Sequence, residues 1–546
     1  MGLSEQTLFE NIQKACMPNR APLFAGRLLQ RAYHNFASSL ALIAPSQRIT
    51  YKDLYFRALL MSRKLAAQGV QKHDRVMILY ENSPAFYIAY FGAWQLGAVC
   101  VPVNTFLHER ELAYIVDDAK PSVVIVSRTL KPLVDSVLSA RSSIPSEAPF
   151  DELTMNDKLD QEKKKHATPI ILSEEAFDWH TPTPENPEAA CNDVTLQELE
   201  PDELCVLLYT SGTTGTPKGV MLSSRNVMTN VMQCFARFTI AGLAQDERFF
   251  CVLPLFHVFA QNVCLWLPAL IGACVILVQK IDRKLILEGL QERPTIFFGV
   301  PPLYGLLCLM KTAPLTSVKI FVSGADMLPD KIRAAFAIIY GRKICTGYGL
   351  SEASPVVAFN LSNNNAATYV VGETLQGITC QIRDENGSVL AVNTVGTLWI
   401  KGNNIMMGYY NSSEATAVIL QDGWLNTGDL GSVDLHGNLA IRGRIKDIII
   451  HKGFNIYPAE IENVLMMHPM VFKAAVIGQE EEMAGQVPIA FVAVRNREPN
   501  MDQLLRKHCT NNLATYKVPR KIVCLDDLPM NATGKIDKKQ LFTMNE

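Results

Sequence analysis

Apolar segments and amphipathic helical patterns alternate along much of the chain. Apolar runs lie at 75–80, 98–104 and 122–127, and helical patterns separate them at 85–96 and 109–118. Runs that are apolar at successive positions, with helices between them, are typical of parallel strands buried on both faces. The pattern therefore predicts an α/β fold, in which helices cover both faces of parallel sheets. Four further apolar runs predict strands at 273–278, 295–300, 318–324 and 342–349.

From residue 374 the pattern changes to short β segments separated by Gly, Asn and Asp turns. This stretch, 374–443, predicts a β-rich part of the first domain. After residue 447, alternating helix and strand patterns predict a separate, small α+β domain. The elements expected there are helices at 459–469 and 501–513 and strands at 473–479 and 488–494.

Residues 142–203 lack both patterns, because they contain charged and Pro-rich stretches. Such composition is typical of a solvated surface insertion. We assign no chemistry to it.

One apolar segment resembles a membrane span. Residues 249–279 contain no Asp, Glu, Lys or Arg, but Pro254, His257 and Pro268 interrupt the segment. The uninterrupted part is shorter than the roughly 20 residues that a span requires. We expect a buried helix followed by a buried strand at 273–278 and no transmembrane segment.

Length and charge narrow the function classes. A chain of 546 residues is too long for one ordinary core, and 48% hydrophobic with 19% charged residues is typical of a folded globular protein. The 53 acidic residues nearly cancel the 51 basic ones, so the overall charge of the protein does not favour binding to nucleic acid or to anionic lipid. Peripheral membrane contact stays open.

The cysteines and the first residues indicate the compartment. The 13 cysteines include no CxxC pair, so neither a zinc ribbon nor a dithiol site is expected. Their odd number, and an opening segment without an apolar stretch, favour reduced thiols in a cytoplasmic protein.

A run of small hydroxyl residues and glycines, YTSGTTGTPKG at 209–219, follows an apolar strand and precedes a helix beginning near Ser224. In such a loop consecutive backbone N–H groups can converge on a polyanion, and Lys218 adds a mobile cation. The P-loop motif does not fit, because Lys218 stands between Pro217 and Gly219 and no Ser or Thr follows it.

A second motif, GYGLSE at 347–352, follows an expected strand. Glu352 occupies the place of the third glycine of a dinucleotide fingerprint, so that interpretation fails. A tyrosine between two glycines can lie along a purine ring, and a glutamate offers Mg²⁺ a hard oxygen ligand.

Five separated motifs are together similar to those of the adenylate-forming enzymes, a superfamily of acyl-CoA synthetases, adenylation domains of peptide synthetases and firefly luciferase. The resemblance extends over about 23–541, and the motifs occur in the family's order and approximate spacing. They lie at 209–219, 347–352, 424–429, 443–447 and 531–535.

The resemblance implies roles for single residues. Tyr348 packs on adenine, Asp429 and Arg444 contact the ribose, and Glu352 holds Mg²⁺ on ATP together with Thr210. Lys535, Lys218 and Glu352 are the implied catalytic residues, because a carboxylate must approach a polyanionic phosphate. The implied ATP and AMP site comprises Thr210, Ser211, Gly212, Thr213, Thr214, Gly215, Lys218, Gly324, Ala325, Gly347, Tyr348, Gly349, Leu350, Ser351, Asp429 and Arg444.

The family also implies a domain rotation between two half-reactions. It predicts an N-terminal adenylation domain over 1–443, a hinge at 444–447 that turns at Lys446, and a mobile C-terminal domain over 448–546. After adenylation the rotation withdraws Lys535 and presents Gly453, which lines the tunnel for the pantetheine arm of coenzyme A. Relatives often carry lysine where Ile450 stands, and Lys452 is the nearby cation here.

The strip 253–260 corresponds to the acyl pocket of the family. Its surroundings lack the acidic residue that would pair with an amino-acid substrate, so amino acids are disfavoured. Small residues leave room for an alkyl chain, whereas the phenylalanines at 256, 259, 297 and 298 fit a pocket or a plain core equally well. His257 fits a carboxylate neighbour or a core histidine. The expected pocket residues are Phe256, His257, Gly299, Val300 and Gly324.

The resemblance therefore implies an ATP-dependent ligase. A fatty acid of medium or long chain would form an acyl-adenylate with release of pyrophosphate, and the acyl group would then pass to coenzyme A. An acyl carrier protein as acceptor, an aryl acid as substrate, and an inactive relative that only binds nucleotide or acyl chains are the alternatives. ATP, Mg²⁺ and coenzyme A are the implied cofactor and co-substrates.

Overall fold

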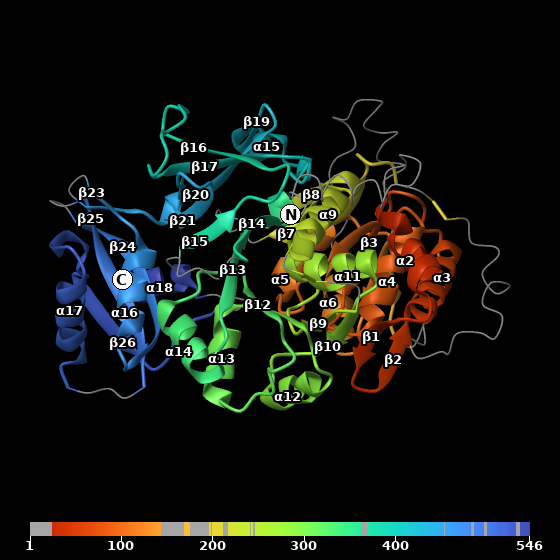
Figure 1. Cartoon of the computed structure of the whole chain (residues 1–546). Helices are drawn as coiled ribbons and strands as arrows, with labels where there is room; N and C mark the ends of the chain where they lie inside the picture. Colours follow the sequence, from red (N-terminus) through yellow and green to blue (C-terminus); the bar gives the residue numbers. More distant parts are fainter. Residues whose placement is uncertain are drawn as a thin grey trace, which may run out of the picture.

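Four sheets organise the part of the chain that is described. The computed structural model describes residues 24–142, 169–174, 179, 196–197, 199–210, 217–240, 242–243, 246–361, 369–451, 454–481, 485–495, 499–530 and 536–545. In Figure 1 the C-terminal domain lies at the left in blue, and a β-rich part lies above the centre. The two large sheets fill the rest of the molecule, with helices between and around them.

The first sheet contains eight strands among the described residues, and its interior pairings are parallel. In strand β11, Phe297 enters one apolar cluster and Phe298 another, so both faces are buried and the run is apolar throughout. The strands, in order across the sheet, are β14 (Val356–Phe359), β13 (Ile344–Gly349), β12 (Ile320–Ser323), β11 (Ile296–Gly299), β9 (Arg248–Cys251), β10 (Cys274–Leu277), β1 (Leu40–Ala44) and β2 (Gln47–Thr50).

The second sheet is parallel in its interior and antiparallel at one edge, where β7, β8 and β18 pair. Its strands within the described ranges are β18 (Gly408–Tyr409), β8 (Lys218–Ser223), β7 (Leu204–Thr210), β4 (Val99–Pro102), β3 (Arg75–Leu79), β5 (Val123–Val126) and β6 (Ile170–Leu172).

The β-rich part forms a third, antiparallel sheet. Its described strands are β15 (Val370–Glu373), β21 (Asn438–Arg444), β20 (Trp424–Val433), β17 (Gly396–Lys401) and β16 (Thr379–Arg383), with β19 (Leu420–Gln421) beside β20. The fourth sheet belongs to the C-terminal domain, which has apolar clusters of its own. It contains β23 (Phe454–Ile456), β22 (Ile449–His451), β25 (Gly485–Val494), β24 (Val471–Glu481) and β26 (Lys521–Leu525).

Helix α4 (Pro84–Gln95) is buried on every side, which explains why nearly all its residues up to Gln95 are apolar. Helix α9 (Ser224–Ile240) is also deeply buried but carries polar residues. Besides short 3-10 turns, the remaining described helices of the first domain are α2 (Leu28–Phe36), α3 (Tyr51–Ala67), α5 (Glu109–Ala119), α6 (Lys131–Ser142), α10 (Val258–Ala260), a π-helix (Gln261–Trp266), α11 (Leu267–Ile271), α12 (Arg283–Gln291), α13 (Pro301–Met310), α14 (Asp330–Tyr340) and α15 (Ser413–Ile419). The C-terminal domain has α16 (Pro458–Met467), α17 (Met501–Asn512) and α18 (Lys538–Asn545).

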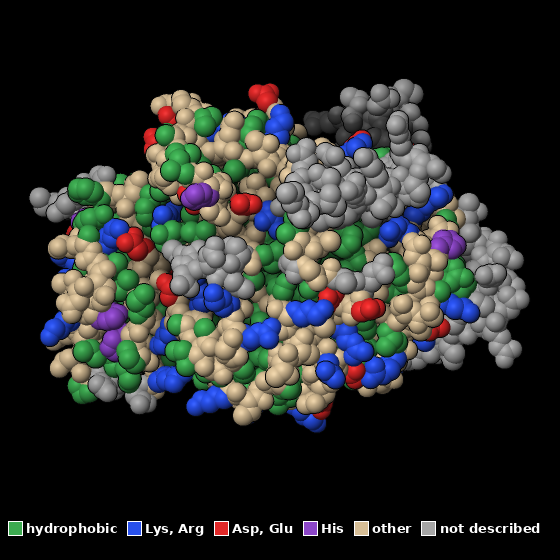
Figure 2. All heavy atoms as spheres, viewed as in Figure 1, with side chains coloured by type: hydrophobic (Ala, Val, Ile, Leu, Met, Phe, Trp, Pro, Cys, Tyr) green, Lys and Arg blue, Asp and Glu red, His purple; other side chains and the backbone are tan. Residues whose placement is uncertain are grey.

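The predicted fold class is confirmed, and so is the βαβαβ order of β3, α4, β4, α5 and β5. The segment 249–279 contains a buried helical stretch followed by β10, as predicted. Among the described residues, no helix is long and apolar enough to cross a membrane. Lys and Arg side chains lie interspersed with Asp and Glu over the face that Figure 2 shows, so this face carries both signs of charge.

The expectation of a solvated insertion needs correction. Residues 170–172, placed in a solvated insertion over 142–203, form β6 and extend the second sheet beside β5. Trp179 and Leu199, from the same segment, are buried because they pack in the apolar cluster that also contains Phe298. Strand β8, which the sequence pattern did not predict, lies directly before α9 and pairs with β7 along its whole length.

Candidate active site

A β-hairpin carries the hydroxyl-rich loop. Thr210 ends β7 and lies opposite Lys218, which begins β8. The Tyr209 hydroxyl donates to Asp118 Oδ2 at 2.6 Å, and Asn411 Nδ2 donates to Asp118 Oδ1 at 3.0 Å. Asp118 thus fixes the base of the hairpin to the chain that follows β18. The rest of the predicted loop, Ser211, Gly212, Thr213, Thr214 and Gly215, lies outside the described residues.

Tyr409 connects this hairpin to the second motif. Lys218 Nζ lies 5.0 Å from the centroid of the Tyr409 ring, and the Tyr409 hydroxyl donates to Glu352 Oε1 at 2.8 Å. Burial raises the pKa of Tyr409 above its ordinary value, and the Glu352 carboxylate raises it further, so the hydroxyl stays protonated and donates. Lys218 and Glu352 therefore face one region, although 134 positions separate them in the sequence (352 − 218).

Tyr348, Asp429 and Arg444 form a second polar group. The Tyr348 hydroxyl donates to Asp429 Oδ2 at 2.5 Å, and Arg444 Nε lies 3.2 Å from Asp429 Oδ1. Asp429 and Arg444 are directly opposite on β20 and β21, so the sheet register sets their pairing. Burial, then the charge of Asp429, raises the pKa of Tyr348 well above its ordinary value. Asp429 itself is only 4% exposed, and a carboxylate so buried requires such partners.

The strand end between these groups is tightly packed. A side chain at Gly349 would overlap the Pro355 carbonyl, so only glycine fits there. Ala325, which follows β12, has a left-handed φ of +68° and is exposed. Alanine adopts this conformation rarely, and such backbone outliers cluster at ligand sites. Gly347, Leu350 and Ser351 lie on the same strand end or in the turn after it.

The expected acyl strip lies at the start of α10. His257 caps this helix, because its Nδ1 accepts a hydrogen bond from Phe259 N at 3.2 Å. Phe256 packs edge-on against Phe106, with ring centroids 6.2 Å apart. The Phe259 ring covers Gly324, and a Cβ built on Gly324 would lie 3.1 Å from it. The space expected beside Gly324 is therefore occupied by an aromatic ring.

Gly299 gives no room for an alkyl chain in this structure. A Cβ at Gly299 would lie 3.0 Å from the Tyr304 ring and 3.1 Å from Leu303, which belong to the second apolar cluster. Phe297 stacks on Phe250 in that cluster at 4.8 Å, so it is a core residue. Val300 is half-buried and caps α13. The reason for the difference is strand alternation, which directs Gly299 and Phe297 to the face away from Phe298.

The C-terminal domain packs beside this site. Lys331 Nζ on α14 donates to the carbonyls of His468 and Val471, at 2.9 and 2.8 Å. Asn463 Nδ2 on α16 donates to Asp330 Oδ2 at 3.0 Å. Figure 1 shows α14 next to α16.

The hinge motif and the end of the chain lie close to each other and to the turn after β12. Burial lowers the pKa of Lys538, but the charges of Glu462, Asp447 and Asp326 outweigh this effect and raise it. Burial lowers the pKa of Lys446, which Asp447 partly opposes. Lys538, three positions after Lys535, thus lies within the electrostatic reach of Asp326. Lys535 itself, with Lys452 and Gly453, lies outside the described residues.

A magnesium ion fits this set of donors. Magnesium is usually held by one or two carboxylates together with substrate phosphates and water. Tyr409 occupies one carboxylate oxygen of Glu352, and within the described residues the second accepts no hydrogen bond. The described residues contain no group of three His, Cys, Asp or Glu that could hold a metal alone. The phosphate oxygens of a bound nucleotide would suit the remaining positions of the shell.

The structure brings together most of the described residues that the motifs selected. Lys218 and Glu352 meet at Tyr409, and Tyr348, Asp429 and Arg444 form one bonded group. The motifs did not reveal Tyr409 or the buried polar side chains of α9. The latter left a readable signal, because Asn226, Asn230 and Gln233 recur at helical spacing in an otherwise buried helix.

Comparison with known proteins gives a consistent picture. Residues 29–410 match the family model described as AMP-binding enzyme, and residues 460–535 match that of the AMP-binding enzyme C-terminal domain. The chain is 32% identical to the long-chain-fatty-acid–CoA ligase of Bacillus subtilis (strain 168), over 93% of this chain and 92% of that protein. It is also 32% identical to 4-coumarate–CoA ligase 2 of Nicotiana tabacum, over 96% and 94%.

A solved structure extends the similarity to the fold. The o-succinylbenzoate coenzyme A synthetase of Bacillus subtilis, in complex with ATP and magnesium ion, superimposes with a TM-score of 0.79 at 26% identity. The alignment covers 94% of this chain and 99% of that one.

Proposed function

Because the chain belongs to the AMP-binding enzyme family, we propose that it is an AMP-forming ligase that joins a carboxylic acid to coenzyme A. ATP and Mg²⁺ are the cofactors, and coenzyme A is the second substrate. The single observation that carries the proposal is the meeting of Lys218 and Glu352 at Tyr409, beside the bonded group of Tyr348, Asp429 and Arg444.

In the first step a carboxylate oxygen attacks the α-phosphorus of ATP. A bond from this oxygen to phosphorus forms, the bond from phosphorus to the bridging oxygen breaks, and pyrophosphate leaves. Asp429 and Arg444 orient the ribose, and Tyr348 lies along the adenine. Lys218 and Lys535 reduce the repulsion between the carboxylate and the phosphates. Glu352 would hold Mg²⁺, which would add positive charge beside those phosphates.

In the second step the sulfur of coenzyme A attacks the acyl carbon of the adenylate. The carbon–sulfur bond forms, the bond to the phosphate oxygen breaks, AMP leaves and the thiol proton passes to solvent. We propose that the C-terminal domain turns at Lys446 between the steps, so that Lys535 gives way to Gly453 and Lys452.

The acid, in our proposal, is a fatty acid of medium or long chain. The strip at 253–260 and its surroundings are uncharged, and the Bacillus subtilis relative is named for such acids. An aryl acid is the second candidate, because the tobacco 4-coumarate–CoA ligase is equally identical to this chain. The Phe259 and Phe298 rings, 6.0 Å apart and edge to face, would suit an aromatic substrate.

The test is the release of pyrophosphate with Mg·ATP against a series of fatty, aryl and amino acids. Coenzyme A and an acyl carrier protein are each supplied as acceptor. We expect release with fatty acids and thioester formation with coenzyme A. Release with aryl acids alone would replace the fatty-acid assignment, and no release with any acid would overturn the ligase proposal.

The described cysteines are free thiols, most of them buried. Such usage is typical of a reducing compartment, and we propose that the enzyme works in the cytoplasm.

A further inference from the structure

Helix α9 carries a stripe of polar side chains on a buried face. Asn226, Asn230, Gln233 and Arg237 are spaced by four, three and four residues, which places them along one side of the helix. They are only 7%, 0%, 1% and 8% exposed. Buried polar groups destabilise a fold unless they are hydrogen-bonded, so the stripe must meet specific partners.

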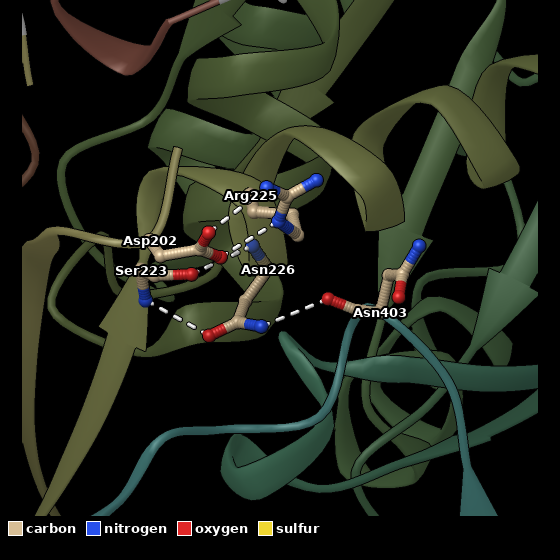
Figure 3. A network of polar contacts seen from close by, with 5 residues as sticks. All are labelled: Asp202, Ser223, Arg225, Asn226 and Asn403. Carbon is tan, nitrogen blue, oxygen red and sulfur yellow. Dashed lines mark hydrogen bonds and ion pairs between the residues drawn. The ribbon is translucent and has the colours of Figure 1, made fainter. Parts of the chain in front are cut away.

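Each member of the stripe donates a hydrogen bond to a backbone carbonyl, and one of these carbonyls belongs to Val356, the first residue of β14. Asn226 Nδ2 donates to Asn403 O at 2.8 Å, as Figure 3 shows, and Asn226 itself is fixed by Ser223. The other three bonds run to the carbonyls of Val356 at 2.7 Å, Gln376 at 2.7 Å and Thr374 at 3.1 Å, from Asn230, Gln233 and Arg237 respectively.

Asn230 is the centre of this network. Besides donating to the Val356 carbonyl, its Oδ1 accepts from Val356 N at 3.0 Å. The same oxygen accepts from Asn262 Nδ2 at 2.9 Å, and Asn262 lies in the π-helix. Asn262 also donates to Ser354 O at 3.2 Å. Widened helical turns of this type occur frequently at functional sites.

The turn that follows Glu352 is held at nearly every carbonyl. Met406 N donates to Glu352 O at 2.9 Å, and Asn404 Nδ2 donates to Ala353 O at 2.8 Å. Asn262 donates a hydrogen bond to the Ser354 carbonyl, and Asn230 donates one to the Val356 carbonyl. Asn404 follows Asn403, the residue that α9 binds through Asn226. Side-chain amides, together with one backbone amide, thus fix the path of a segment with little regular secondary structure.

Helix α9 begins at the residue after β8, the strand that Lys218 opens. One rigid element therefore joins the hairpin that carries Lys218 to the turn that carries Glu352. We propose that the polar stripe of α9, with Asn262 and Asn404, is a positioning network that sets the Glu352 carboxylate relative to Lys218. This inference rests on the proposed role of Glu352 in holding Mg·ATP.

The test replaces Asn262 with leucine, which has a similar shape and removes both donated bonds. Mg·ATP binding is measured by titration calorimetry, and the Mg²⁺ concentration for half-maximal pyrophosphate release is measured in parallel. Loss of groups that orient a metal ligand typically costs about 10–100-fold in affinity or activity. We expect both constants to rise about tenfold. Asn404→Ala serves as the second variant if Asn262→Leu fails to fold.

The control is Gln95→Met. Gln95 is 1% exposed and accepts a hydrogen bond from Ser62 at 2.9 Å on a different pair of helices. The Gln95→Met variant should have a lower melting temperature, while its Kd for Mg·ATP stays within about twofold of wild type. Folded Asn262→Leu and Asn404→Ala proteins with unchanged Kd and unchanged Mg²⁺ dependence would overturn the positioning role. If the wild-type protein binds Mg·ATP but activates no acid, the proposed function is wrong. The positioning role can still be tested in that case, because the comparison of Kd values does not depend on turnover.

Discussion

The nucleotide side and the acyl side of the candidate site are built by different interactions. On the nucleotide side, side chains are bonded in fixed geometry, as in the Tyr348–Asp429–Arg444 group. On the acyl side, Phe259 covers Gly324 by ring packing. Directed hydrogen bonds define one arrangement, whereas an aromatic ring can change rotamer at small cost when a substrate enters. Under the proposed function, the nucleotide would therefore meet a fixed arrangement of side chains, whereas the acid would meet a pocket that can adapt to it.

Of the variants considered, Asp429→Ala should weaken the use of Mg·ATP most severely. The change removes the acceptor of the half-buried Tyr348 hydroxyl and the partner of the exposed Arg444 guanidinium. We expect kcat/KM for Mg·ATP to fall by about 10²–10³-fold. ATP–pyrophosphate exchange measures the effect, with Glu414→Ala, an exposed carboxylate of the same part, as control. A fall of less than about threefold would remove Asp429 from the ribose site.

Lys446→Pro tests whether the two sides are used at different times. Proline fixes φ at the proposed hinge and should block the domain rotation. We expect adenylate formation to stay near wild type while thioester formation falls about hundredfold. Lys446→Ala removes the same charge but keeps the backbone free, so it should retain both steps. Equal loss of both half-reactions in the proline variant would contradict the hinge.

Phe259→Ala sharpens the contrast on the acyl side. Removing the ring opens the space over Gly324, so bulkier or longer acids should gain in kcat/KM by about tenfold relative to short ones. KM for Mg·ATP should not change, because the nucleotide side is bonded independently. The measurement is pyrophosphate release over a series of chain lengths, with exposed Leu309→Ala on α13 as control. A parallel rise in KM for Mg·ATP would show that the two sides are coupled.

Tyr409→Phe should give the smallest effect. The ring that faces Lys218 is retained, and only the hydrogen bond to Glu352 is lost. One such bond contributes about 0.5–1.5 kcal/mol, so the Mg²⁺ requirement should rise about threefold to tenfold. Tyr410→Phe, whose side chain packs at Gly219, is the matched control. An unchanged Mg²⁺ requirement would mean that Tyr409 does not orient the glutamate.

Local patterns predicted much of the fold because a strand that is buried on both faces of its sheet is apolar at successive positions. The runs that became β3, β4 and β5 are apolar at successive positions since helices cover both sides of the sheet. Strand β6 escaped notice because three residues in a charged, Pro-rich stretch are too few to form a period. Their partner, β5, lies far enough away along the chain that only the folded sheet reveals the pairing.

The motifs of the sequence by themselves determined the family and the order of the domains, and they predict the nucleotide-binding residues, because phosphates and ribose demand particular residue types at particular places. Only the tertiary structure decided which way Gly299 faces, that Phe259 fills the space beside Gly324, and that Tyr409 joins Lys218 to Glu352. It alone also gave the α9 amides their partners. The physical reason is that these contacts join residues remote in sequence. The sequence around an amide or an aromatic ring does not indicate which distant carbonyl or glycine it will contact in the fold.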